Sequence, residues 1–491
     1  MNSTSSTQQQ DIQNIKKLPI LISLIIGAFF SILNETLLNI ALPKLEVALE
    51  VSASTLQWLA TGYMLVVGVL IPVSALLVQW FTTRQMFLGA MVLFTAGTLL
   101  CGIAPNFELL LIGRLLQASG AGLMLPVMMN TILVLYPPET RGAAMGTIGL
   151  VIMFAPAIGP TLSGLILQFA DWRWLFFLVL PFAVLSIAVS FIFLKNVTTV
   201  TRPKVDVLSI LLSTLGFGGI VFGFSSAGKP EATWASTEVY VPLIVGGVSL
   251  LLFVIRQLKS KEPMLDLRVF KFPMFTLTTI MLIIAMMTMF STMLLLPFLM
   301  QGVFLMTTFA AGLVLLPGGL LNGLVSPITG KLFDKFGPRA LVIPGSILLL
   351  LIMWLFTRID LQTTTTILVI LHILMMIAIA MIMMPMQTNG LNQLPQRLYP
   401  HGTAVLNTLQ QIAGAIGVAL FISIMTSGQQ SYFMTLTAEP TPAQIAEGLL
   451  AGIHRAFVVG LAFAIVALAL SLFTKRTKAP VEQLAADHSA S

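Results

Sequence analysis

Long apolar segments, separated by short polar ones, make up most of the chain. They are about 20 residues long, which is the length a helix needs to cross ~30 Å of hydrocarbon. This length excludes a transmembrane barrel, whose strands alternate apolar and polar residues over about 10 positions. We therefore predict an all-α membrane protein. Its fourteen predicted spans are residues 18–42, 55–78, 85–104, 109–135, 143–168, 174–194, 206–225, 239–255, 274–299, 309–330, 340–356, 366–386, 402–426 and 456–473.

The composition excludes a soluble protein. Soluble chains carry about 25% charged residues, whereas this chain of 491 residues is 57% hydrophobic and only 9% charged. The first apolar segment follows Lys16 and Lys17 and could pass for a signal peptide. It lacks a small-residue cleavage site and continues through LNETLLNIALP, so we interpret it as the first span. The single cysteine, Cys101, excludes an intrachain disulfide.

The basic residues are distributed unevenly between alternate loops. Nineteen of the 25 Lys and Arg lie in one set of loops and in the two tails. Five lie in the other set, namely Lys44, Arg173, Lys229, Arg358 and Arg455. The positive-inside rule then places both termini in the cytoplasm. Because these charges act as topology signals in short loops, the net charge of +7 does not indicate a nucleic-acid partner.

A repeat divides the chain. The loop after the tenth predicted span, residues 330–339, reads GKLFDKFGPR, and the loop after the second, residues 75–84, reads ALLVQWFTTR. The leucine and the final arginine have the same spacing in both. We therefore predict two parallel six-helix halves, an arrangement known from transporters that bind their substrate near the bilayer midplane. The predicted parts are a cytoplasmic tail (1–17), a first half (18–200), an extra two-helix pair (201–262), a second half (263–477) and a second cytoplasmic tail (478–491).

Several motifs resemble the major facilitator superfamily. GKLFDKFGPR fits its loop signature, Gly-x-Leu-x-Asp-x-x-Gly-x-Arg, and LIGRLLQASGAG (111–122) resembles its fourth-span motif. The segment GLVIMFAPAIGPTLSG (149–164) resembles its fifth-span antiporter motif. Together with LNETLLNIALP and DWRWLFF, they look like the fourteen-span drug:proton antiporters, and most like the multidrug and lincosamide exporters of Gram-positive bacteria. The resemblance covers all the spans.

The sequence departs from the family pattern in the first loop copy, in the first span, and at Ala155 and Ser163, which replace two glycines of the antiporter motif. The first loop copy has Gln79 where the family usually has Asp, and Thr82 where it has Gly. In the first span the family's usual acidic position is Asn34, with Glu35 immediately after it. One residue turns a helix by about 100°, so Glu35 need not face where the family's acid faces.

Two charged residues inside spans are the candidates for proton coupling, Glu35 and Arg114. A charge inside the bilayer costs about 2.5–3.5 kcal/mol on insertion scales, so it is a functional candidate by default. Glu35 could carry a proton or balance a cationic substrate. Alternatively, it could bond Thr36 or Asn39 as a packing contact. The resemblance implies that Arg114 tunes the protonation of an acid or stabilises a water-filled cavity; the alternative is that it bonds the carbonyls of a neighbouring span.

The resemblance also implies a gating loop and a substrate cavity. In the loop, Asp334 would cap the next helix and pair with basic residues, which would lock one conformation. The gating-loop candidates are Gly330, Asp334, Gly337 and Arg339. The candidates for a wet central cavity are polar residues within spans, and each could equally be a contact between helices. They are Asn34, Asn39, Gln57, Gln117, Asn130, Gln387, Asn407 and Gln410.

The antiporter-like segment is rich in small residues and proline. Its candidate positions are Gly149, Ala155, Pro156, Gly159, Pro160 and Gly164. Ala155, Gly159 and Ser163 follow one another at intervals of four, so they share a helix face. We expect this face to let a helix of the other half approach closely, beside a bend at the two prolines. Plain tight packing is the alternative.

The combined interpretation is proton-coupled export of amphiphilic drugs across the cytoplasmic membrane by alternating access. No phosphate-binding Gly-x-x-x-x-Gly-Lys-Ser/Thr loop appears, so the expected energy source is the proton gradient, without a cofactor or a metal. The expected partners are the lipid bilayer, protons and small amphiphiles, and a monomer is expected. The alternatives are a proton- or sodium-coupled nutrient symporter and a non-transporting receptor or scaffold. An enzyme is not expected, because no paired acids or nucleophile–base set appears.

Overall fold

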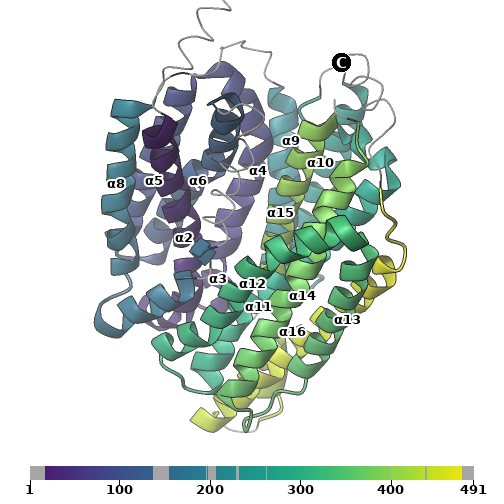
Figure 1. Cartoon of the computed structure of the whole chain (residues 1–491). Helices are drawn as coiled ribbons and strands as arrows, with labels where there is room; N and C mark the ends of the chain where they lie inside the picture. The colour runs from purple at the N-terminus through teal and green to yellow at the C-terminus, as the bar shows by residue number, and fades with distance from the viewer. Residues whose placement is uncertain are drawn as a thin grey trace, which may run out of the picture.

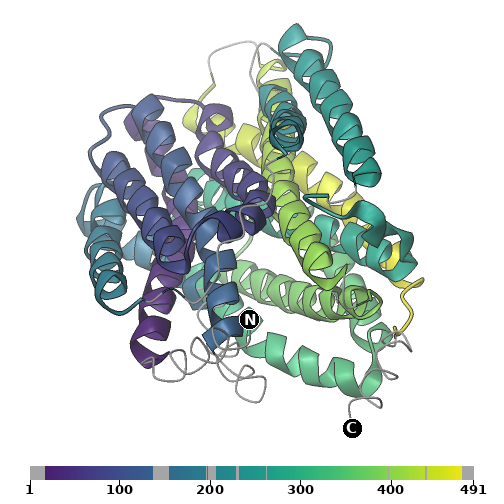
Figure 2. The ribbon, with the colours of Figure 1, turned by 90° about the horizontal axis from the view of Figure 1, so that it is seen from above.

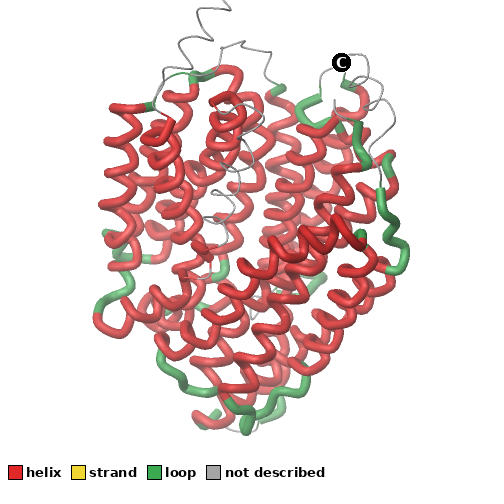
Figure 3. Tube along the Cα trace, in the orientation of Figure 1, coloured by secondary structure: helices red, strands yellow, loops and turns green. Residues whose placement is uncertain are grey.

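A computed structural model describes residues 17–135, 154–156, 158–194, 196, 206–227, 232–260, 263–395, 398–436 and 440–477. Thirteen helices in this part are long and apolar enough to cross a membrane, and the helix Phe154–Phe169 is a shorter apolar one. Helices run roughly side by side through the molecule, joined by short loops (Figure 3). The predicted all-α membrane fold is confirmed. The predicted span 143–168 is described only from Phe154 onward.

The first group of helices lies on one side of the molecule (Figure 1). In it α2 packs on α6 and α8, α5 packs on α6 and α8, and α4 packs on α6. Glycines let α5 and α6 touch backbone to backbone: a Cβ on Gly113 would lie 2.9 Å from the backbone nitrogen of Cys101. The helices are α2 (Lys17–Leu49), α3 (Ala53–Leu56), α4 (Trp58–Trp80), α5 (Thr83–Gly102), α6 (Phe107–Leu135), Phe154–Phe169 and α8 (Trp174–Phe193).

The last group of helices occupies the other side (Figures 1 and 2). In it α14 packs on α11, α12 and α13, while α15 packs on α11 and α16. The elements are η1 (Leu267–Lys271), α11 (Pro273–Phe298), the π-helical turn η2 (Leu299–Val303), α12 (Thr308–Phe336), α13 (Arg339–Phe356), α14 (Thr365–Asn392), α15 (Tyr399–Phe433) and α16 (Pro442–Ser471).

The helices α9 (Val207–Ser226) and α10 (Thr237–Lys259) form a tight pair, and α9 also packs on α4 and α15. At one end, Arg256 holds Asp206 through Nε and Nη2 at 2.8–3.0 Å. Partial burial alone would raise the pKa of Asp206, but hydrogen bonds from Arg256 and Ser209 outweigh it and lower this pKa below its ordinary value. At the other end, α9 is bonded to both groups of helices. From the first group, the Gln57 amide donates to Ser225 Oγ at 2.7 Å. From the last group, the Ser423 hydroxyl of α15 donates to the carbonyl of Phe224 at 2.7 Å.

Two helices are longer than predicted. The predicted spans 402–426 and 456–473 leave residues 427–455 as a loop, but α15 continues to Phe433 and α16 begins at Pro442. Thr441 starts α16 with a capping box, in which its side chain and that of Gln444 satisfy each other's backbone N–H groups. Arg455 therefore lies within α16, where it donates to Ser431 Oγ of α15 at 2.9 Å. The added helical residues mix polar and apolar side chains, so the length of the apolar segment alone does not predict them.

Candidate functional site

The guanidinium of Arg114 lies at the centre of a polar cluster between α2, α4, α5 and α6, and its side chain is 1% exposed. Its Nη1 donates to Asn34 Oδ1 and to Gln117 Oε1, both at 2.7 Å. Its Nε donates to the carbonyl of Leu59 at 3.4 Å, and its Cζ lies 4.3 Å from the centre of the Tyr63 ring. Hydrogen bonds to a charged donor are stronger than neutral ones, so this arginine ties α6 to α2 and α4.

The cluster continues from Gln117 into α5. Gln117 Nε2 donates to Thr98 Oγ1 at 2.8 Å, and the Thr98 hydroxyl donates to the carbonyl of Phe94 at 2.7 Å. All three side chains are fully buried. The chain of bonds therefore fixes both the position and the rotamer of the group that accepts from Arg114. Two predicted residues, Asn34 and Gln117, thus lie in this cluster, and Gln117 has no contact with an open cavity.

Glu35 lies beside this cluster without joining it. The side chain is half-buried and has no hydrogen-bond or ion-pair partner among the described residues, but it interacts electrostatically with Arg114 and Tyr63. The alternative expectation of a bond to Thr36 or Asn39 is not met, since the Thr36 hydroxyl donates to the Leu33 carbonyl of its own helix at 3.0 Å. The neutral Asn34 therefore holds Arg114, and Glu35 is left as a nearby carboxylate.

The helix Phe154–Phe169 contacts α2 through Gly159. A Cβ on Gly159 would overlap Thr36 Oγ1 and would lie 3.0 Å from Thr36 Cβ. Ala155, one turn earlier, is fully buried in an apolar cluster with residues of α2, α5, α6 and α8. The face formed by Ala155 and Gly159 therefore packs within its own group of helices. This corrects the expectation that it meets the other half.

A different face of the same helix meets α12. A Cβ on Gly164 would lie 2.6 Å from the Thr308 carbonyl, and one on Gly312 would lie 2.6 Å from the Pro160 carbonyl. The Thr161 hydroxyl donates to the carbonyl of Gly312 at 3.1 Å. The close approach between the two groups of helices is thus real, but it uses Pro160, Thr161 and Gly164.

Another contact between the groups lies nearby. Gln301 Nε2, in the π-helical turn η2, donates to the carbonyl of Ile40 in α2 at 3.0 Å. At the same end, and within the first group, Lys44 near the end of α2 donates to the carbonyl of Leu167 at 2.5 Å. These bonds lie at the end of the bundle where α2 ends and α12 begins. Neither Gln301 nor Thr161 is among the predicted site residues; for Gln301, the only signal in the sequence is a polar residue next to a span.

The predicted gating loop is mostly helical. Gly330 and Asp334 belong to the last turns of α12, which leaves Gly337 and Pro338 between α12 and α13. Gly337 has φ 78°, a conformation that favours glycine. Arg339 Nε donates to the carbonyl of Thr474, beyond the end of α16, at 2.5 Å.

Of the predicted cavity residues, Asn34 and Gln117 share a bonded cluster, and no bond between any two of the others is seen among the described residues. Gln57 is buried and fastens α9, and Asn39 is buried in α2. Gln387 in α14 and Asn407 in α15 are half-buried, and Gln410 in α15 is buried with Nε2 unpaired. The side chains of Asn130, Gln79 and Asp334, and all of Gly149, lie outside the described part of the structure. Pro156 is half-buried. Within the described residues, no three His, Cys, Asp or Glu side chains meet as metal ligands do.

Two helical groups, a helix pair fastened to both, and a buried arginine beside a carboxylate with no bonding partner among the described residues are features expected of a multi-pass membrane transporter. The family description "Major Facilitator Superfamily" matches residues 24–418. The chain belongs to this superfamily.

Similar proteins include drug exporters. The chain is 54% identical over 466 residues to "Lincomycin resistance protein LmrB" of Bacillus subtilis (strain 168), covering 95% of this chain and 97% of that protein. It is 27% identical over 423 residues to "Multidrug export protein EmrB" of Haemophilus influenzae, covering 86% and 83%. Among solved structures, a POT family transporter in complex with 5-aminolevulinic acid matches with a TM-score of 0.70 at 16% identity, covering 94% of this chain and all of that one. This last likeness supports the fold alone.

Proposed function

We propose that this protein exports amphiphilic drugs across the cytoplasmic membrane in exchange for protons, by alternating access. The resistance and export proteins it resembles along almost its whole length support drug efflux. One observation carries the proton coupling: Glu35 is a carboxylate within a span, close to a buried arginine and without a bonding partner among the described residues.

Asn34 and Glu35 differ in their relation to Arg114, and this difference supplies a coupling mechanism. Asn34 is neutral at every relevant pH, so its bond to Arg114 persists whether or not a proton is bound. Glu35 changes charge when it binds a proton. When ionised, it offsets the buried guanidinium; when protonated, it leaves that charge to be balanced elsewhere. Proton binding therefore changes the electrostatic energy of the α2–α6 contact and biases the conformation of this half.

The two halves would be residues 18–200 and 263–477, with the pair 201–262 between them. The distribution of Lys and Arg supports cytoplasmic termini. On this orientation, the bonds of Gln301 and Thr161 across the halves lie on the outer side. The conformation described here would then be closed toward the outside, and these bonds would have to break for release of the drug.

The antiporter-like segment would connect the two processes. Its Pro160 and Gly164 face contributes to outer closure, while Gly159 touches Thr36, the residue next to Glu35. A shift of this helix during opening would therefore be transmitted to the proton carrier. With Glu35 as the one carboxylate near the cluster among the described residues, neutral or monocationic amphiphiles fit better than dications.

Replacement of Glu35 tests the proposal. Glu35→Gln keeps the shape and removes the titrating group, so we expect normal insertion but no drug-driven proton movement in proteoliposomes. The matched control is Glu108→Gln, an exposed acid in the first turn of α6. Full drug–proton exchange by the Glu35→Gln protein would exclude the assignment. Increased uptake of a sugar or amino acid, with no lowered dye accumulation, would indicate a nutrient symporter instead.

A further inference from the structure

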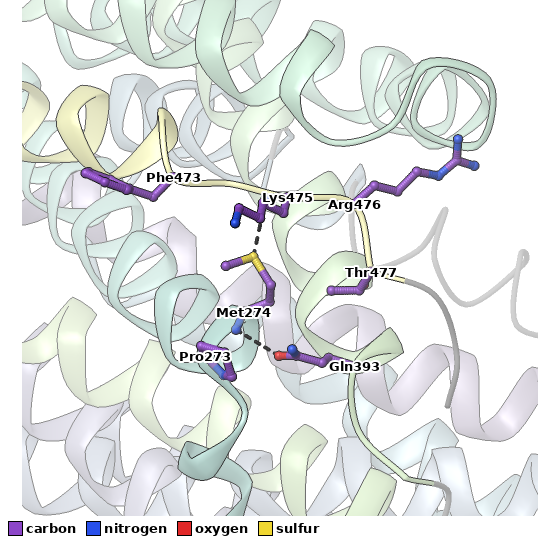
Figure 4. A pocket seen from close by; sticks show the side chains of 7 residues that line it. All are labelled: Pro273, Met274, Gln393, Phe473, Lys475, Arg476 and Thr477. Carbon is purple, nitrogen blue, oxygen red and sulfur yellow. Dashed lines mark hydrogen bonds between the residues drawn. The ribbon is translucent and has the colours of Figure 1, made fainter. Parts of the chain in front are cut away.

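A pocket of about 490 Å³ lies at the end of the bundle where α11 begins and α14 and α16 end (Figure 4). In it, Gln393 Oε1 already accepts from the backbone N–H of Met274, in the first turn of α11, at 2.8 Å. None of the residues that line this pocket has a buried side-chain polar atom without a partner. Two such atoms lie instead in the cluster around Arg114, namely Asn34 Nδ2 and the hydroxyl oxygen of Tyr63.

The Tyr63 side chain, in α4, is almost completely buried. Its ring lies against the Arg114 guanidinium, with 4.3 Å between Cζ and the centre of the ring. Its hydroxyl interacts with Ser31 in α2, but the two side chains make no hydrogen bond of normal geometry. An unpaired buried donor is costly, so we expect this hydroxyl to gain a partner in another state of the protein.

Glu35 is the partner that the local geometry favours. Ser31 and Glu35 lie four residues apart in α2, so they are neighbours on one face of this helix. Long side chains in a helix point back toward its N-terminus, so the Glu35 carboxylate extends toward the turn that carries Ser31. Tyr63 interacts with both residues. The carboxylate and the Tyr63 hydroxyl therefore lie on the same side of α2.

The other polar groups of the cluster are held elsewhere. The bonds of Arg114 go to neutral acceptors, as described above. The thiol of Cys101, in α5, points to the carbonyl of Leu110 at 3.6 Å. Asn34 Nδ2 is unpaired, but the bond of Oδ1 to Arg114 fixes this amide, and adjacent residues of a helix project about 100° apart. The Tyr63 hydroxyl is thus the donor best placed for Glu35.

Titratable residues are scarce on the other helices that contact α2. The helices α3, α8, α11 and Phe154–Phe169 contain no Asp, Glu, His, Lys, Arg, Cys or Tyr. Those of α12 lie in its last two turns, at residues 331, 334 and 335. Within the described part of the chain, Arg114 and Tyr63 are therefore the titratable groups that face Glu35.

We propose that Tyr63 is a positioning residue for the proton carrier, and that its hydroxyl donates to the Glu35 carboxylate when Glu35 is ionised. When Glu35 binds a proton, the hydroxyl returns to Ser31, while the ring holds Arg114 in both states. Tyr63 keeps its own proton throughout, so the bond stabilises the ionised form without taking part in the transfer. The contact between α2 and α4 therefore changes with proton binding. This role rests on the proposed use of Glu35 in proton coupling.

The test compares Tyr63→Phe with the unchanged protein, because phenylalanine keeps the ring against Arg114 and removes only the hydroxyl. Drug-driven proton movement is measured in proteoliposomes over a range of pH. The ionised form of Glu35 loses a donor, so the pH of half-maximal exchange should rise by about one unit or more, the effect of one hydrogen bond to a charged group. The same rise is expected in the pH dependence of drug binding by the purified protein in detergent, which needs no turnover.

Two further variants make the result specific. Tyr240→Phe removes the hydroxyl of an exposed tyrosine in α10 and should leave the pH midpoint unchanged. Ser31→Ala removes the other partner of the Tyr63 hydroxyl and should not raise the midpoint. An equal rise in Tyr240→Phe would overturn the proposal, and so would a Tyr63→Phe protein that is slower but has an unaltered midpoint.

The Glu35→Gln protein separates this role from the proposed function. Full exchange by Glu35→Gln would reject proton coupling through Glu35, and the role of Tyr63 with it. Loss of exchange in Glu35→Gln, together with an unchanged midpoint in Tyr63→Phe, would reject the role of Tyr63 alone.

Discussion

Gly159 offers the sharpest test of the contact between the antiporter-like helix and α2. In Gly159→Ala, the new methyl would overlap Thr36 Oγ1 and lie 3.0 Å from Thr36 Cβ, whereas ordinary contacts are 3.4–4 Å. The two helices must therefore separate by about half an ångström or more, and overpacking of this kind costs about 1–3 kcal/mol. Because Thr36 adjoins Glu35, we expect the carboxylate to move as well. A misplacement near 1 Å at a reacting group can reduce a rate by about 100-fold.

The assay is the initial rate of efflux of a fluorescent amphiphile under an imposed proton gradient, normalised to the amount of inserted protein. The control is Gly89→Ala in α5, where a Cβ would meet nothing within 4 Å. Both Gly→Ala changes raise helix propensity by about 1 kcal/mol. The difference in efflux rate between the two variants therefore reports the steric overlap with Thr36 alone. Adding Thr36→Ala to Gly159→Ala removes the overlapping oxygen and should restore part of the rate. Equal efflux by the Gly159→Ala and Gly89→Ala proteins would refute the reasoning.

Three further predictions concern other contacts. Arg114→Ala should lower the free energy of unfolding by about 3 kcal/mol, because hydrogen bonds to a charged group contribute about 1.5–3 kcal/mol each. Thermal or denaturant unfolding measures the change, and an unchanged unfolding midpoint would contradict the stabilising role of the Arg114 cluster. Gln57→Ala should cost about 1 kcal/mol by the same assay, since it removes the bond to Ser225. Asp206 has a lowered pKa in the folded protein, so its contribution is full at neutral pH and is lost as the pH falls through that value. Asp206→Asn should therefore flatten the acid side of the stability profile, and an unaltered profile would argue against the ion pair with Arg256.

The spans were predictable because apolar length is a local property of the sequence. The ends of the helices were not, since Thr441 and Gln444 cap α16 well before the predicted span, and this added part contains both exposed polar residues and buried ones such as Leu450 and Ile453. The polar residues show a second limit. Asn34 and Gln57 were both expected to line a cavity, yet one accepts from Arg114 and the other donates to α9. A single sequence shows that such residues need partners, but the partner depends on which helices become neighbours.

The antiporter-like segment shows the same limit within one helix. The interval of four residues correctly grouped Ala155 with Gly159 on a face. It did not indicate the neighbour of that face, because Pro160 and Gly164 make an adjacent face that also permits close approach. The candidate roles of Glu35, Arg114 and the gating loop stay predictions.

The attachment of α9 has a mechanical consequence. Gln57 and Ser423 come from opposite groups of helices but bond neighbouring residues of α9, whereas Asp206 at its other end pairs with Arg256 of α10. A 20-residue helix is about 30 Å long. Because both groups hold α9 near Ser225, a rotation of the helix about that end moves the Asp206 end the most. A tilt of about 10° there displaces the far end by roughly 5 Å. The helix pair can therefore follow a wide opening on one side of the membrane while the joint between the halves on the other side hardly moves.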